Sequence, residues 1–177
     1  MDQVKNSYPE KKEVAFVAVS IPMDKINAAI KASTASKEVK AAAQVIIRNE
    51  TGNGHSIING TNPTGTQADS GRWASIWDSK IVATCCKKEG MTGKLRRFIV
   101  FDTLSTGIAF LIDRIENKGI FIGEHVDSRY YKGDVTTPEQ LAVAYWQEWV
   151  VGEQTKPSDT FIKDFVSMYK QAVILFS

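Results

Sequence analysis

The chain has 177 residues, of which 43% are hydrophobic and 24% are charged, a composition typical of a globular protein with a buried core. Its 22 Lys and Arg residues nearly balance 20 Asp and Glu residues, and the resulting charge of +2 does not favour nucleic acid binding, which requires many cations against phosphates. No apolar run reaches the length of a membrane span, and the first residues lack the order of a signal peptide, so we expect a protein made in the cytoplasm.

The N-terminal part of the chain is polar up to position 12 and is predicted to form a flexible leader, followed by a single domain over residues 13–177. A short apolar run over residues 14–21 indicates either a strand or a buried helical turn. Pro22 suits the first position of a helix that continues through Ile26 and Ile30.

A second helix is predicted after Ser36, which is a favourable N-cap, because apolar residues such as Ala43 and Ile46 recur at helical spacing. The stretch Thr51-Gly52-Asn53-Gly54 ends this helix. Position 50 lies four residues after Ile46 and seven after Ala43, so we expect Glu50 on the face that points into the protein.

The middle of the chain combines a long loop with a hairpin. Residues 54–78 have a turn residue at almost every third position and are predicted to form one ordered loop, a kind of segment that is often functional. Residues 80–86 and 95–101 favour strands, and the Gly-containing stretch 89–93 between them indicates a β-hairpin.

The remainder of the chain is predicted to be helical. An apolar stripe over residues 104–115 indicates one helix, a capping box over residues 137–140 begins another that stops at Gly152, and Ser158 caps a last one. The order of elements predicts an α+β fold that is mainly helical, with a small β-hairpin lobe.

Cysteine and histidine are too few for a metal or disulfide framework. Cys85 and Cys86 are adjacent, which is poor geometry for a mutual disulfide, and we interpret them as packing residues of a strand. With His55 and His125 as the only histidines, no Cys/His zinc site can be formed.

Glu50 is the candidate with the most specific chemistry. Burial on a helix face and the partial negative charge of the helix C-terminus would both raise the pKa of its carboxyl, which suits a general acid acting on a glycosidic oxygen. The alternative is a glutamate at a frayed helix end that points into solvent.

The loop after Glu50 offers amide groups and flat apolar rings, which suit sugar hydroxyls, N-acetyl groups and pyranose faces. The alternatives are that the polar residues serve turns and that the tryptophans anchor the loop to the core. The candidate residues are Asn62, Gln67, Asp69, Trp73 and Trp77.

The order of these motifs resembles the lysozyme-like peptidoglycan hydrolases, and most closely their glucosaminidase branch. A helix ending in Glu50-Thr51-Gly52-Asn53-Gly54 is followed by Asn62-Pro63-Thr64-Gly65-Thr66-Gln67 and then by a hairpin. The stretch 96–102, the helix after it, and Tyr130-Tyr131-Lys132-Gly133 before the helix that begins near Pro138 follow the same order. The resemblance covers about residues 36 to 152.

This resemblance implies a lysozyme-like catalytic domain that cleaves a β-1,4 linkage between amino sugars of the bacterial cell wall. Glu50 would be the proton donor, Tyr130 or Tyr131 would line the cleft near the scissile bond, and the loop candidates would bind the glycan strand. No metal or organic cofactor is implied, and we expect a monomer. The resemblance also suggests a phage origin, with action on the wall after release or as a virion component.

The sequence leaves the second catalytic group open. Retaining and inverting glycosidases need a second carboxylate, for which Asp69 and Asp78 are the candidates, although both also suit turns or an N-cap. Assistance by the N-acetyl group of the substrate, or release of an anhydro-sugar as in lytic transglycosylases, would need only Glu50. A non-catalytic wall-binding or virion structural module is the alternative outside the enzymes.

Overall fold

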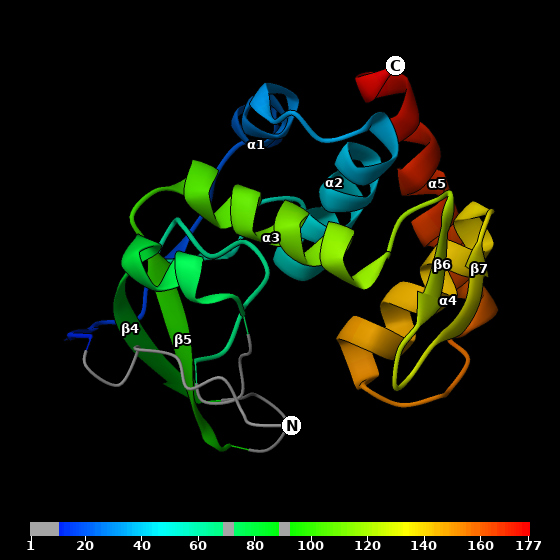
Figure 1. The fold of residues 1–177 in the computed structure, drawn as a ribbon. Coiled ribbons are helices and arrows are strands. Elements are labelled where there is room, and N and C mark those ends of the chain that lie inside the picture. Colours follow the sequence, from blue (N-terminus) through cyan, green and yellow to red (C-terminus); the bar gives the residue numbers. More distant parts are fainter. Residues whose placement is uncertain (1–10, 69–72, 89–92) are drawn as a thin grey trace. The chain divides into compact units, whose positions relative to one another are not determined.

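The computed structural model describes residues 11–68, 73–88 and 93–177, and it has the α+β fold that the sequence predicts (Figure 1). Its contacts divide the chain into two compact units, Met1–Ala29 with Ile47–Phe110 and Ile30–Ile46 with Leu111–Ser177. The single domain over residues 13–177 stays a prediction. Most of the predicted leader, residues 1–10, lies outside the described residues.

The first unit holds most of the strands. In chain order, its strands and one 3-10 helix are β1 (Glu13–Val14), β2 (Ala18–Val19), β3 (Ile57–Ile58), the 3-10 helix η2 (Ser75–Lys80), β4 (Ile81–Lys88) and β5 (Leu95–Phe101). Three longer helices contribute residues to both units, and they are α1 (Met23–Ala32), α2 (Lys37–Thr51) and α3 (Leu104–Lys118). The apolar run over residues 14–21 therefore contains two short strands.

The predicted hairpin is confirmed as the antiparallel pair β4–β5, and β1 adds to it in parallel, giving the strand order β1-β4-β5. The predicted loop over residues 54–78 is more regular than expected, because β3 pairs with β2 and η2 forms near its end. Apolar clusters of its described residues hold this unit together. One joins Trp73, Phe101 and Phe110, and another surrounds Cys85.

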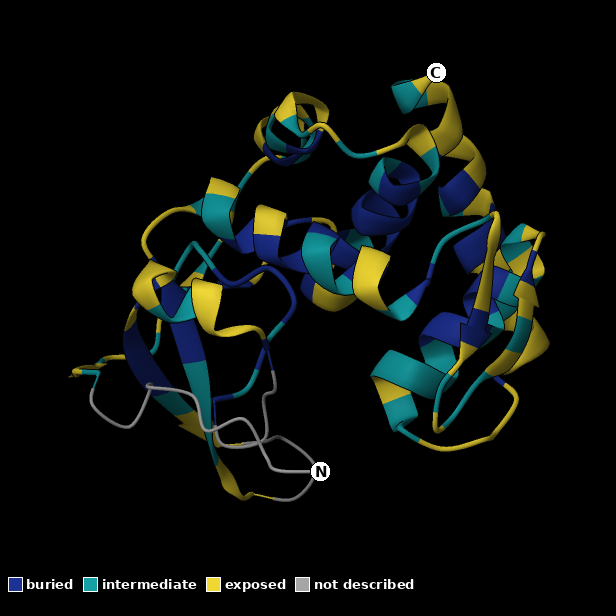
Figure 2. Cartoon of the chain, viewed as in Figure 1, coloured by how far each residue is buried: buried dark blue, intermediate teal, exposed yellow. Residues whose placement is uncertain are grey.

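Helix α2 has the predicted start and end. The Ser36 hydroxyl accepts a hydrogen bond of 3.3 Å from the Val39 N–H, and Figure 2 shows the buried middle of the helix. Its last turn differs from the prediction, because Ile47 and Thr51 take the inward positions, at 0% and 3% exposure, whereas Glu50 is exposed. The expected burial of Glu50 is wrong.

The second unit adds a small hairpin to its helices. The elements after α3 are β6 (Glu124–Asp127), β7 (Lys132–Val135), α4 (Pro138–Tyr145), the π-helical segment η3 (Trp146–Val151) and α5 (Asp159–Phe176). Aromatic side chains pack α4 against α5, where the Tyr145 ring stacks on Phe165 at a centroid distance of 5.5 Å.

The prediction that this region is entirely helical is wrong, because β6 and β7 form an antiparallel pair. Each strand has four residues, and each buries only one of them, Val126 in β6 and Val135 in β7. A single buried position gives no alternation of apolar and polar residues, which is the signal by which a strand is recognised.

Candidate functional site

The backbone around Glu50 is held in one conformation by its neighbours. The Thr51 hydroxyl donates to the Ile47 carbonyl at 2.6 Å and accepts from the Gly54 N–H at 2.7 Å. Asn53 has a positive φ of 59° and its side chain accepts from the Arg48 Nε at 2.8 Å. The carboxylate of Glu50 is thus exposed on a fixed backbone at the end of α2.

Gly54 closes this turn against the chain before α1. Its carbonyl accepts a hydrogen bond of 2.8 Å from the Ile21 N–H. A Cβ at position 54 would lie 2.3 Å from the Ile21 carbonyl oxygen, and φ is +84°, so only glycine fits. The sequence interpretation that this glycine-rich stretch ends the helix is confirmed.

Asn62 lies inside the loop, at 1% exposure, rather than on its surface. Its side-chain amide donates to the carbonyls of Thr66 at 3.0 Å and Ile99 at 2.9 Å, and its oxygen accepts from the Thr66 N–H at 3.0 Å. Both N–H groups of the amide are used within the protein, so the geometry assigns Asn62 to holding the loop against β5.

Gln67 lies in the part of the loop that runs beside β5. The two segments form an isolated antiparallel bridge between Gln67 and Phe98, and the Ala68 N–H donates to the Arg97 carbonyl at 2.8 Å. The Gln67 side chain is half-buried. The loop is therefore tied to the hairpin along its last residues.

The two tryptophans pack against the core, as the alternative interpretation of the loop expects. Trp73 is 7% exposed and donates its Nε1–H to an Asp78 carboxylate oxygen at 3.0 Å. Both indole rings meet Phe110 edge-on, with centroid distances of 6.0 Å for Trp73 and 5.3 Å for Trp77. Trp77 is half-buried and keeps part of its ring accessible.

Of the two candidates for a second carboxylate, the structure describes Asp78 but not Asp69. Asp78 accepts the hydrogen bond of the Trp73 indole, which is a structural contact. Asp69 lies outside the described residues.

Tyr130 and Tyr131 belong to the second unit, in the turn between β6 and β7. They line a hollow of about 360 Å³ together with Lys132, Gln147 and Gln154. The Arg129 guanidinium lies 5.3 Å from the centroid of the Tyr130 ring. Burial, and then the charge of Asp134, raise the pKa of the Tyr131 hydroxyl, which donates to the Asp134 carbonyl at 3.3 Å.

Glu148 organises this turn, and sequence reasoning missed it. One oxygen of its carboxylate accepts from the backbone N–H groups of Tyr130 at 3.0 Å and Tyr131 at 2.7 Å, and from the Ser128 hydroxyl. The other oxygen lies 3.5 Å from the Lys118 ammonium, and the Glu148 side chain is 3% exposed. Helical spacing could have predicted its inward position, because position 148 lies seven residues after Leu141 and four after Ala144, both of which are buried.

Within residues 11–68, 73–88 and 93–177, no group of three or more His, Cys, Asp or Glu side chains is arranged to hold a metal ion. In that part of the chain, no helix has the length and apolar character needed to cross a membrane.

The chain was also compared with known proteins. No family model matches the chain, and no curated protein or solved structure matches it either.

Proposed function

We propose that this protein is a glycosidase that cleaves a β-1,4 linkage between amino sugars of bacterial peptidoglycan, with Glu50 as the general acid. The sequence resemblance suggests this activity. The observation that carries it is the placement of Glu50, an exposed carboxylate at the end of α2 whose backbone is held by Thr51 and Asn53.

The proposed chemistry needs a carboxyl group that can reach the substrate. The protonated Glu50 carboxyl gives its proton to the glycosidic oxygen as the C–O bond to the leaving sugar breaks. Exposure supports this role only in allowing the carboxyl to touch a glycan, because it removes the burial on which the expected general-acid behaviour was based. A turn held by hydrogen bonds also supports it, because catalytic groups need a fixed position.

The second step of the reaction remains a choice between three chemistries. The first is a second carboxylate, for which Asp69 stays the predicted candidate, whereas Asp78 is not supported because it accepts the hydrogen bond of the Trp73 indole. The N-acetyl group of the substrate can attack the anomeric carbon, and release of an anhydro-sugar as in lytic transglycosylases also requires Glu50 alone. The products separate transglycosylation, which leaves anhydro ends, from hydrolysis by either of the other two routes, which leaves reducing ends.

The setting of this activity follows from the resemblance. We propose that the enzyme is a monomer of phage origin that acts on the wall after release or as part of a virion. It requires no metal or organic cofactor for the proposed acid catalysis.

The test compares soluble fragments released from purified peptidoglycan by the wild-type protein, Glu50→Gln and Glu116→Gln, with mass spectrometry as the readout. Glu116 is an exposed glutamate on α3 and provides the matched control. We expect fragments from the wild type and Glu116→Gln only. Full activity of Glu50→Gln would contradict the proposal. Wild-type protein that sediments with the wall but releases nothing would indicate a binding or virion structural module.

A further inference from the structure

The end of the β4–β5 hairpin carries a concentration of positive charge that the total charge conceals. We call its five cationic residues, Lys87, Lys88, Lys94, Arg96 and Arg97, the cationic hairpin. Residues 84–98 contain five of the 22 Lys and Arg residues and one of the 20 Asp and Glu residues, which leaves 17 and 19 for the rest of the chain. The near balance over the whole chain is therefore an average over a positive hairpin and a slightly acidic remainder.

The strand register brings these charges together. Lys87 pairs with Arg96 directly across the two strands, and Lys88 pairs with Leu95. Like charges at directly opposite positions of an antiparallel pair destabilise it. The register therefore gathers cationic side chains from both strands at this end of the hairpin.

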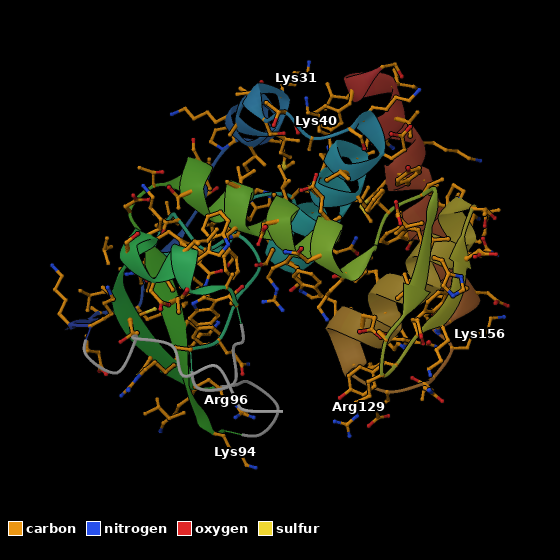
Figure 3. The ribbon with its side chains drawn as sticks, in the orientation of Figure 1. Lys31, Lys40, Lys94, Arg96, Arg129 and Lys156 are labelled. Carbon is orange, nitrogen blue, oxygen red and sulfur yellow. The ribbon has the colours of Figure 1, made fainter. Side chains whose placement is uncertain are left out.

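The cations are presented on an ordered frame. The Lys87 ammonium lies 4.9 Å from the centroid of the Phe16 ring, and Arg97 Nη2 lies 3.5 Å from Glu13 Oε2. Lys87, Lys88 and Lys94 are exposed, and Figure 3 shows the Lys94 and Arg96 side chains at the end of the hairpin. Several cations along two paired strands suit a ligand that carries negative charge at regular intervals.

We propose that the cationic hairpin binds a linear polyol-phosphate polymer of the bacterial wall. The choice of a wall polymer rests on the proposed function, because a glycosidase of peptidoglycan works where such polymers are attached. The electrostatic attraction comes from lysine and arginine against successive phosphodiesters, with release of counterions from the polymer.

The surroundings of the hairpin favour this polymer over a single-stranded nucleic acid. Proteins that bind single strands offer aromatic rings on which bases stack. In the described segments 11–16, 84–88 and 93–98, the two aromatic residues are Phe16, which lies under Lys87, and Phe98, which packs against the buried cluster around Cys85. A phosphodiester chain without bases needs no stacking surface.

The test measures binding of poly(glycerol phosphate) to the full chain over a series of salt concentrations. Wild-type protein is compared with the triple variant Lys87→Gln, Lys88→Gln and Lys94→Gln, and with an arginine version of the same three positions. We expect the glutamine variant to bind at least about tenfold more weakly at low salt and to reduce the slope of log K against log salt by about 2. The arginine version should bind as the wild type does.

A matched control removes the same charge elsewhere. Lys31→Gln, Lys163→Gln and Lys170→Gln change three exposed lysines, and this variant should retain wild-type affinity. Equal loss in both triple variants would show a response to net charge alone and overturn the proposal. Tighter binding to single-stranded DNA of equal phosphate number, or to vesicles of anionic phospholipid, would also overturn it.

The binding result is separable from the enzymatic one. Poly(glycerol phosphate) has no amino-sugar linkage, so Glu50→Gln should bind it with unchanged affinity. Binding without release of peptidoglycan fragments would contradict the proposed glycosidase and leave the hairpin site standing. Release of peptidoglycan fragments without polymer binding would contradict the hairpin site and leave the proposed glycosidase standing.

Discussion

The carboxylate of Glu148 accepts a hydrogen bond of 2.7 Å from the backbone N–H of Tyr131, and the same oxygen accepts from the N–H of Tyr130 at 3.0 Å. A carboxylate from the π-helical segment therefore holds the turn between β6 and β7, and so presents the two tyrosines to the hollow that they line. Single turns of π-helix inside α-helices are frequent at functional sites.

Glu148→Gln should lower the free energy of unfolding by about 2–3 kcal/mol, because charged acceptors make the stronger hydrogen bonds and the buried carboxylate of Glu148 also pairs with the half-exposed Lys118. Denaturant-induced unfolding measures this loss. Glu139→Gln, at an exposed position of α4, should change stability by less than about 0.5 kcal/mol. Equal stabilities of the two variants would contradict a structural role for Glu148.

Asn62→Ala should lower the free energy of unfolding by about 2–4 kcal/mol, because it removes three buried hydrogen bonds and leaves the Thr66 and Ile99 carbonyls without the amide. Thermal unfolding in the absence of any glycan is the measurement, with Asn117→Ala at an exposed position of α3 as the control. If Asn62 served only to bind substrate, both variants would unfold at the same temperature.

Gly107→Ala tests the close approach of α3 to the loop, because a Cβ at position 107 would lie 1.9 Å from the Thr61 carbonyl oxygen. Alanine is favoured over glycine in helices by about 1 kcal/mol, yet we expect a net destabilisation of about 1–3 kcal/mol from overpacking. Chemical denaturation of Gly107→Ala and of the exposed Ser105→Ala would measure it. A stabilised Gly107→Ala would show that the loop moves away at little cost.

Cys85 and Cys86 should differ in reactivity. Burial, and then the charges of Cys86 and Glu13, raise the pKa of the Cys85 thiol to about 11, and its side chain is fully buried. Alkylation of Cys85→Ser and Cys86→Ser near pH 8, followed by mass spectrometry, should show fast labelling at Cys86 and slow labelling at Cys85. Similar rates would contradict the buried environment of Cys85.

The same thiol predicts a pH dependence of stability. The pKa of Cys85 is raised in the folded state, so its protonated form contributes stability that is present below the unfolded pKa of about 9 and is lost as pH rises towards 11. The free energy of unfolding should therefore fall more steeply between pH 9 and 11 in the wild type than in Cys85→Ala. Parallel curves would contradict this assignment.

Local sequence signals located most of the helices. The capping box at Thr137 is confirmed, since its hydroxyl accepts from the Gln140 N–H at 3.2 Å and the Gln140 side chain accepts from the Thr137 N–H at 3.1 Å. Ser158 likewise caps α5 by accepting from the Phe161 N–H at 3.1 Å. Such caps involve residues three apart, so their geometry is set within one turn of the chain.

The positions of the site residues were predicted less well from the sequence than the helices were. The spacing argument placed Glu50 inward by continuing the stripe through Ile46, but the inward face at the end of α2 passes through Ile47 and Thr51. A one-residue shift turns a helix by about 100°, which is enough to exchange a buried position for an exposed one. The same spacing argument, continued from α4 into η3, would have found Glu148.

By itself, the sequence determined the α+β class, the helix caps and the hairpin β4–β5, because these depend on short-range periodicity and on turn residues. Only the tertiary structure decided that Asn62 holds its loop, that Glu148 binds the turn before Tyr131, and that Lys87 faces Arg96. Each of those relationships joins residues separated by 9 to 37 positions. Strand register and buried polar contacts are settled by packing across the fold, which local propensity does not contain.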